Sequence, residues 1–443
     1  MHPYLPHTQG DIKAMLERCH VGSLDELYSD VPDSLRLKRP YSLPKAMSEP
    51  ELGRYFKTQI GDANKPLRCF AGAGWYHHYC PAAVQSLLSR SEFLTAYTPY
   101  QPEISQGTLQ YIFEYQSMMC ELTGMDVSNA SMYDGATATA EAVVMAVNAS
   151  KKRRRVLVSA TLAPAVAQVI ATYAAGAHIT VEVIAEDRGV TSRTELEQMI
   201  CAGDVAAVVV ASPNYYGILE DYSGFAELCH QNKALFIVNS HATTLSVLRT
   251  PGEWGADIAC GEAQSLGMPM NYGGPGLGYL CCKRALMRKL PGRIVGATTD
   301  AAGRRSFVLT LQAREQHIRR QKATSNICSN QGIMTLHAAI YMSLMGAKGL
   351  RRVNRISAEA AHALADKMLA TGKVVMKFPG QVFLNEFAVE TVSPLTADTL
   401  LKALEEKGIL GGVKLTENSI LVAATEMCTP DDIEMYVSNL NSL

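Results

Sequence analysis

Two patterns of apolar residues alternate through the middle of the chain. Short runs rich in Val, Ile and Ala, such as residues 155–160 and 205–212, have the length and composition of strands buried on both faces. Between such runs lie longer stretches, such as 137–150 and 163–177, whose apolar residues are spaced for one face of a helix. The other predicted elements are helices at 107–124, 193–201 and 224–232 and strands at 179–184, 234–240 and 276–282. The pattern predicts a large α/β domain over residues 66–328, with a mainly parallel sheet covered on both faces.

The pattern changes in the last quarter of the chain. A long helical stretch over residues 333–371 leads into short strands mixed with helices. The predicted strands are 373–378, 382–389 and 420–425, and the predicted helices are 396–408 and 429–441. This mixture predicts a smaller α+β domain over residues 329–443.

The first 65 residues predict a helical arm. Short helical segments are separated by prolines, and both Ser23–Glu26 and Ser48–Glu51 have the spacing of a capping box. No long strand is present, so we expect this arm to pack on a neighbouring surface instead of folding alone.

The composition narrows the class of partner. The chain has 443 residues, of which 47% are hydrophobic and 19% charged, and 41 basic residues nearly balance 42 acidic ones. No net field would attract nucleic acid or an anionic membrane, so small molecules and other proteins are the expected partners.

The expected compartment is the cytoplasm. The N-terminus has polar residues and prolines where a signal peptide needs an apolar core, and no apolar run approaches the roughly 18 residues of a membrane span. Eleven cysteines without a C-x-x-C pair indicate reduced thiols and predict no metal site.

Two glycine-containing stretches suggest ligand chemistry. Gly135 stands at the start of a predicted helix in "YDGATATAEA", where backbone amides and the helix dipole favour an anion, although such a start can also be a vestige. The cluster at 273–278 precedes a strand instead of a helix, so it predicts a turn and no dinucleotide-binding loop.

Longer motifs carry a family resemblance. The segments 97–110 ("YTPYQPEISQGTLQ"), 122–142, 261–280 and 314–331 resemble the P-protein of the glycine cleavage system, and the resemblance extends over essentially the whole chain. It implies the type I pyridoxal-phosphate-dependent transferase fold, similar to aspartate aminotransferase. Within the family, the chain is similar to subunit 1 (alpha) of the two-subunit form.

The resemblance also identifies a missing amine. In this family the lysine that forms a Schiff base with pyridoxal phosphate belongs to the other half, and Gln264 or Ser265 stands at the corresponding place here. Neither side chain can form an imine. Lys283 or Lys322 could replace that lysine, although an ordinary solvated or ion-paired lysine is the expected state of both.

A second part of the cofactor apparatus is missing as well. The aspartate expected beside the pyridinium nitrogen is replaced by Val238, Asn239 and Ser240 at the end of a predicted strand. Without that carboxylate the protonated ring has no counter-ion, so we predict that this chain alone holds no catalytic pyridoxal phosphate.

The implied function is that of the alpha subunit of glycine dehydrogenase (aminomethyl-transferring). Pyridoxal phosphate would be held by the beta subunit, and the aminomethyl group left after decarboxylation of glycine would pass to the lipoyl arm of the H-protein. A heterodimer doubled to α2β2 is expected. A non-catalytic scaffold or regulatory subunit of the same complex is the alternative.

The resemblance also directs attention to one loop. This loop spans residues 97–106, and Pro99 and Pro102 fix the backbone angle φ within it, so that it presents its polar groups in a preset geometry. The interface candidates for catalysis are Tyr97, Tyr100 and Glu103, and the candidates for a substrate or partner site are Gln101, Ser105, Gln106, Asp134 and Lys322. Ser105 could also be a simple helix N-cap. The loop 70–81 ("FAGAGWYHHYCP") is expected to contact the partner subunit, because adjacent histidines do not face the same way and make a poor metal pair.

Overall fold

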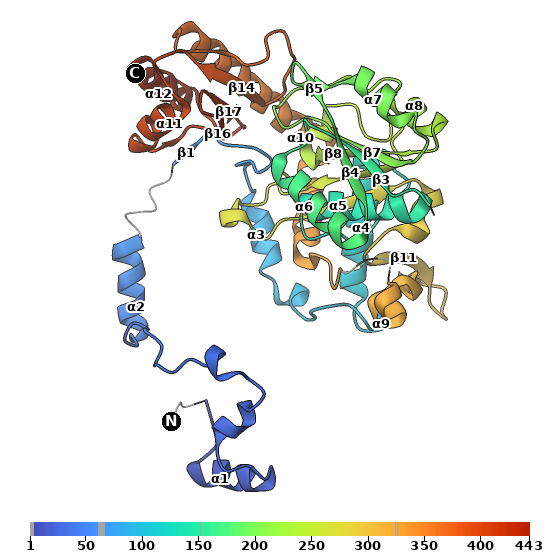
Figure 1. The fold of residues 1–443 in the computed structure, drawn as a ribbon, viewed down its shortest axis with the longest axis vertical. Coiled ribbons are helices and arrows are strands. Elements are labelled where there is room, and N and C mark those ends of the chain that lie inside the picture. Colours follow the sequence, from blue (N-terminus) through green and yellow to red (C-terminus); the bar gives the residue numbers. More distant parts are fainter. Residues whose placement is uncertain (1–3, 61–66, 151, 324, 326) are drawn as a thin grey trace. The chain divides into compact units, whose positions relative to one another are not determined.

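The structure is a computed structural model that describes residues 4–60, 67–150, 152–323, 325 and 327–443 (Figure 1). The chain forms two compact units, Met1–Lys65 and Pro66–Leu443. Within the described residues, no helix is both long and apolar enough to cross a membrane. Residues 66–443 form one unit by this division, and the boundary predicted within it at residue 328 stays a prediction.

The first unit is helical in its described part. Its elements are α1 (Gln9–Arg18), η1 (Leu24–Tyr28), η2 (Asp33–Leu35), α2 (Glu49–Tyr55) and η3 (Phe56–Ile60). The capping box predicted at Ser48 is confirmed, because Glu51 accepts from the Ser48 backbone at 2.8 Å. The one predicted at Ser23 is wrong: the Ser23 side chain makes no capping bond, and Glu26 accepts from the Gly22 backbone instead. None of residues 4–59 is buried.

A seven-stranded sheet is the centre of the second unit. Its order is β2-β10-β9-β8-β7-β3-β4; the five strands from β9 to β4 are parallel, and β10 and β2 are antiparallel to their neighbours. The strands are β2 (Val127–Ser128), β3 (Arg155–Ser159), β4 (Thr180–Ile184), β7 (Val205–Ala211), β8 (Leu235–His241), β9 (Ile258–Glu262) and β10 (Gly278–Cys282). The predicted mainly parallel sheet is confirmed.

Strand β7 shows why this sheet is covered on both faces. Ala207 and Val209 point into one apolar cluster, and Val208 and Val210 point into another, because side chains alternate along a strand. Helices α5 (Gly135–Ser150) and α6 (Pro164–Ala177) supply the first cluster, and α7 (Arg193–Ile200) and α8 (Phe225–Gln231) supply the second. Burial on both sides requires the unbroken apolar runs seen in the sequence.

A third apolar cluster joins α4 (Gln106–Thr123) to the long helix α10 (Gly332–Ala370). Near them lies a hairpin of β11 (Ile294–Thr299) and β12 (Arg305–Thr310). Neither this hairpin nor β9 was predicted from the apolar pattern.

The C-terminal part contains a four-stranded antiparallel sheet in the order β13-β14-β17-β16. Its elements are β13 (Val374–Met376), β14 (Glu386–Thr391), α11 (Ala397–Glu406), β16 (Val413–Thr416), β17 (Ser419–Ala423) and α12 (Pro430–Asn441). The second half of α10 packs on this sheet, whereas its first half packs on α4, so one helix serves two cores. The remaining elements of this unit are β1 (Arg68–Cys69), α3 (Ala82–Leu88), η4 (Ser91–Phe93), β5 (Glu186–Asp187), β6 (Val190–Thr191), η5 (Ala242–Ser246), η6 (Asn271–Gly273), η7 (Arg284–Lys289), η8 (Gln312–Arg314), α9 (Gln316–Arg319), η9 (Arg320–Lys322) and β15 (Ile409–Leu410).

Candidate functional site

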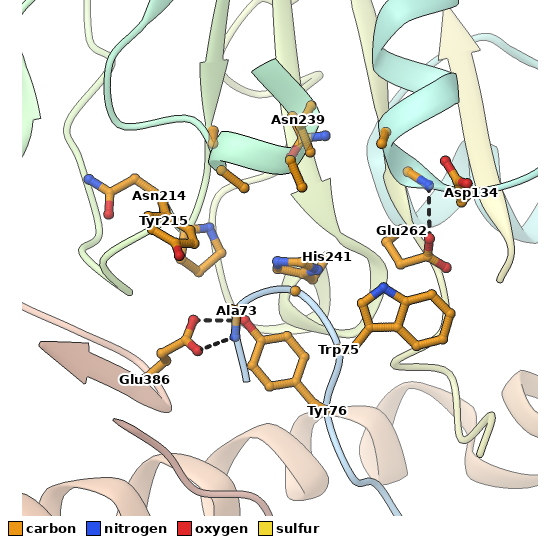
Figure 2. A pocket seen from close by; sticks show the side chains of 18 of the residues that line it. Ala73, Trp75, Tyr76, Asp134, Asn214, Tyr215, Asn239, His241, Glu262 and Glu386 are labelled. Carbon is orange, nitrogen blue, oxygen red and sulfur yellow. Dashed lines mark hydrogen bonds between the residues drawn. The ribbon is translucent and has the colours of Figure 1, made fainter. Parts of the chain in front are cut away.

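A cavity of about 250 Å³ lies at the carboxyl ends of the parallel strands β7, β8 and β9 (Figure 2). Open α/β sheets bind their ligands at the carboxyl ends of the strands, because the loops there diverge and leave a crevice. The lining includes loop 73–76, the starts of α5 and α6, the ends of the three strands, and Glu386 from β14. The cavity therefore joins segments that are far apart in the sequence.

Glu386 holds the loop 73–76 against the cavity. Its carboxyl group accepts from the Ala73 amide at 2.6 Å and from the Tyr76 hydroxyl at 2.9 Å. Burial raises the pKa of Glu386 to about 7, so a substantial part of this group is protonated at neutral pH. A side chain at position 72 would place its Cβ 2.2 Å from the same carboxyl group, so the contact depends on Gly72.

His241 lies at the end of β8 and faces the same loop. Its ring meets the Tyr76 ring nearly at right angles, with 5.1 Å between the centroids. Burial lowers the pKa of His241 to about 4, and the imidazole is therefore neutral at physiological pH. Its Nδ1 atom has no hydrogen-bond partner among the described residues.

The start of α5 is occupied by two carboxylates of the chain itself. Asp134 accepts from the Thr137 amide at 2.8 Å. Glu262 accepts from the Gly135 amide at 2.8 Å (Figure 2). Glu262 stands at the end of β9 and is buried. The predicted candidate Asp134 thus lines the cavity, but its carboxylate already caps a helix.

The predicted place of the Schiff-base lysine lies outside the cavity. Gln264 is fully buried; its amide nitrogen donates to the Tyr76 and Met268 carbonyls at 2.9 and 2.7 Å, and its oxygen accepts from the Tyr76 amide at 3.0 Å. Ser265 is also buried and accepts from the Thr243 amide at 3.3 Å. Neither lines the cavity, so these residues brace the backbone instead of presenting a reactive group.

No carboxylate is found at the end of β8 either. Asn239 lines the cavity and donates to the Thr139 hydroxyl at 2.7 Å. An amide cannot serve as the counter-ion of a protonated ring. The residues at these positions therefore do not fit a covalently held pyridoxal phosphate in this chain.

Neither alternative lysine reaches the cavity. Lys283 donates to Asp257 at 3.0 Å. Asp257 immediately precedes β9, so this lysine lies at the amino end of that strand, away from the cavity at its carboxyl end. Lys322 is exposed in η9 and is not among the lining residues.

The loop 97–106 is a separate surface feature. Tyr97, Tyr100, Gln101 and Glu103 are exposed, and none of the loop's residues lines the cavity. Ser105 occupies the N-cap position of α4, but its side chain makes no capping bond.

Two contacts fix this loop to the hairpin region. The Gln106 amide makes paired hydrogen bonds of 2.9 and 2.8 Å with the backbone of Phe307 in β12. The Tyr100 hydroxyl accepts from Arg293 at 3.4 Å, and the Arg293 guanidinium lies over the Tyr100 ring. The loop thus presents its exposed side chains from an anchored backbone.

Sequence reasoning singled out Asp134, Gly135 and Asn239, which line the cavity, but it missed the other polar groups that build it. Tyr76 and His78 were expected to contact a partner, but both are buried in this chain, where His78 bonds to Glu426 at 2.8 Å. His241 and Glu386 gave no local signal, since they approach Tyr76 only in the folded chain. Glu262 lies within the segment that begins at residue 261 and resembles the family, and its position two residues beyond the apolar run 258–260 was the available clue.

Comparisons with known proteins agree over the full length. The family profile described as glycine cleavage system P-protein matches residues 2–440. The chain is 46% identical over 449 residues to the probable glycine dehydrogenase (decarboxylating) subunit 1 of Geobacillus thermodenitrificans (strain NG80-2), with 99% of each chain covered. A crystal structure of glycine decarboxylase (P-protein) of the glycine cleavage system, in inhibitor-bound form, superposes with a TM-score of 0.87 at 41% identity, covering 100% of both chains.

A more distant structure shares the fold alone. The sphingosine-1-phosphate lyase of Burkholderia pseudomallei K96243 superposes with a TM-score of 0.68 at 13% identity, covering 93% of this chain and 94% of the other. The predicted α/β fold of the type I pyridoxal-phosphate-dependent enzymes is confirmed.

Proposed function

The chain belongs to the glycine cleavage system P-protein family, and from this membership we propose that it is one of two different subunits of a glycine dehydrogenase (decarboxylating). Its own part in the reaction is to complete, from across an interface, a site whose cofactor belongs to the second subunit. The relatives named as subunit 1 over their full length support this division.

We place the pyridoxal phosphate on the second subunit because the positions for holding it here are otherwise engaged. Gln264 bridges two backbone segments, Asn239 offers no carboxylate, and Glu262 fills the start of α5. When bound, pyridoxal phosphate draws electrons away from the carbon that loses carbon dioxide. This chain would act by position and electrostatics alone.

The loop 97–106 is the proposed contribution to the shared site. Tyr97 and Tyr100 are hydroxyl donors and Glu103 is an acceptor, and all three are exposed on a loop anchored by Gln106 and Arg293. An anchored backbone allows exposed groups to meet a partner surface with little loss of conformational freedom. Gln101 and Lys322 are exposed and remain candidates for the same interface, and the buried Ser105 remains a candidate for a supporting role.

The remaining partners follow from the proposed activity. The substrate is glycine, the acceptor of the aminomethyl group is the lipoyl arm of the H-protein, and the assembly is an α2β2 tetramer. The observation that carries the proposal is the full-length match to a P-protein in a chain whose cavity is lined, among the residues that the structure describes, by no lysine.

Reconstitution tests the proposal. Exchange of labelled bicarbonate into glycine is measured with lipoylated H-protein and with this chain, the second subunit, or both. We expect exchange only with both subunits, and borohydride treatment should fix the cofactor to the second subunit alone. Exchange by this chain alone would refute the division.

Alanine variants then separate a shared site from a scaffold. Replacing Tyr97, Tyr100 or Glu103 by alanine should lower turnover by about two to three orders of magnitude, the range for losing one preorganised transition-state contact. Association of the subunits is measured in parallel, with the exposed Glu92 replaced by alanine as a matched surface control. Unchanged turnover in all three variants would favour a purely structural role.

A further inference from the structure

The Glu262 carboxyl group accepts three hydrogen bonds beside the start of α5. Oε2 accepts from the Gly135 amide at 2.8 Å, and Oε1 accepts from the Gln264 and Leu277 amides, each at 2.9 Å. All three donors are backbone N–H groups, and they come from α5, from the segment after β9 and from the segment before β10. Such a convergence of amides on one oxyanion group is the geometry by which proteins hold phosphate.

The cavity around this contact is unsuited to a second anion. None of the residues described as lining it is a lysine or an arginine, and His241 is neutral. Three carboxyl groups, those of Asp134, Glu262 and Glu386, belong to the lining. A phosphate ester entering here would meet acids and no counter-charge.

The space around the Glu262 carboxyl group is also tightly packed. A Cβ atom added at Gly276 would lie 3.2 Å from Glu262 Oε2, and one added at Gly135 would lie 2.7 Å from the Glu262 amide nitrogen. Burial raises the pKa of Glu262, and its three backbone donors oppose that rise. The start of α5, the segment after β9 and the segment before β10 thus all bind the Glu262 side chain and leave little space beside it.

We propose that Glu262 is a built-in substitute for a phosphate group: it occupies the anion position at the start of α5, ties three segments together there, and excludes phosphate esters from the cavity. In a related fold that binds a phosphorylated cofactor, the ligand would make these contacts. Here the chain makes them itself. The inference concerns binding and stability, so it stands independently of the proposed catalytic partnership.

The test removes the carboxylate and offers phosphate instead. Thermal unfolding of the full chain is recorded for the native protein and for Glu262→Ala, with inorganic phosphate or with chloride at equal ionic strength. A second probe is pyridoxine 5′-phosphate, which has the same phosphate group and no aldehyde to react with lysines. We expect no saturable effect of either probe on the native protein. The variant should have a lower Tm, raised by both probes by at least about 2 °C in a saturable manner.

Glu220 supplies a matched control. It is equally buried and also accepts three hydrogen bonds, from Thr161, Thr191 and Asn214, but only one donor is a backbone amide and none opens a helix. Glu220→Ala should lower the Tm without any specific response to phosphate.

Two results would overturn the proposal. One is a saturable phosphate response of the native protein equal to that of the variant. The other is a folded Glu262→Ala protein that phosphate does not stabilise. If the alanine variant does not fold in either buffer, the same comparison on Glu262→Ser decides, because serine leaves most of the space of the carboxyl group open and keeps one hydrogen-bonding oxygen.

Discussion

At the scale of one residue, the contacts of Gln264 explain why we expect a lysine introduced at position 264 not to bind a cofactor. Its side chain is completely buried and bonded to the backbone of Tyr76 and Met268, and it does not line the cavity. We predict that Gln264→Lys gives a destabilised protein without an imine. An ammonium group would be buried there and the Tyr76 backbone left unpaired, at a cost of about 3–5 kcal/mol.

The measurement combines urea unfolding with absorbance after addition of pyridoxal phosphate. Gln264→Met is the control, because it removes the hydrogen bonds without adding charge and should be less destabilised. A yellow protein whose cofactor borohydride fixes to residue 264 would contradict the prediction.

The raised pKa of Glu386 predicts that the free energy of unfolding depends on pH. Its pKa in the folded chain is about 7, above the usual 4.5, so the folded state binds more protons than the unfolded state between these values. The contribution of Glu386 to stability is therefore complete below about pH 4.5 and is lost as the pH rises through about 7. The difference of 2.5 pKa units corresponds to about 3 kcal/mol.

Glu386→Gln isolates this effect, because the amide resembles the protonated acid and does not titrate. His241 contributes a slope of opposite sign below about pH 6.5, since its pKa is lowered to about 4, and the variant keeps that slope. We expect the free energy of unfolding of the native protein, relative to the variant, to fall by up to about 3 kcal/mol between pH 5 and pH 8. Parallel curves in urea titrations over this range would show that Glu386 titrates normally.

At the scale of elements, the sequence predicted what local patterns encode. Strand β7 is an unbroken apolar run, and α6 has a regular apolar face, so both were predicted near their true bounds. Strand β9 was missed because its apolar run is short and ends in Gly261 and Glu262. The cavity was missed for another reason: its groups come from loop 73–76, three strand ends and β14, and no local pattern brings these together.

The bend of helix α10 occurs at one residue with non-helical backbone angles. Gly346 has φ 58° and ψ 179°, a conformation open to glycine and costly for residues with a Cβ atom. We predict that Gly346→Ala lowers the free energy of unfolding by about 1–3 kcal/mol. No neighbour lies within 4 Å of the added Cβ, so the loss would reflect the backbone alone.

Gly176→Ala in α6 is the matched control, since its Cβ also meets nothing within 4 Å and its φ is ordinary for a helix. This variant should be neutral or more stable by up to about 1 kcal/mol. Equal effects of the two substitutions in urea titrations would count against a strained bend at Gly346.

At the scale of the whole molecule, the first unit has no core of its own among its described residues. Residues 4–59 include no buried side chain, and large apolar groups are strongly exposed, including Tyr4 at 86%, Leu35 at 76%, Tyr41 at 77% and Leu43 at 76%. Exposed apolar groups in such number mark a surface that another protein covers. We infer that this arm binds the second subunit.

Deleting residues 1–65 tests this inference, because β1, which pairs with β15, begins only at Arg68 and stays in place. The Tm of the remaining chain should change by no more than about 2 °C, whereas its affinity for the second subunit, measured by sedimentation, should fall at least tenfold, or about 1.4 kcal/mol. Serine at Leu35, Tyr41 and Leu43 in the full chain should reproduce much of that loss, since it removes the apolar contact and keeps the backbone. If both proteins bind the second subunit as tightly as the native chain does, then the arm is not part of the interface, and the exposed loop 97–106 must account for more of the association.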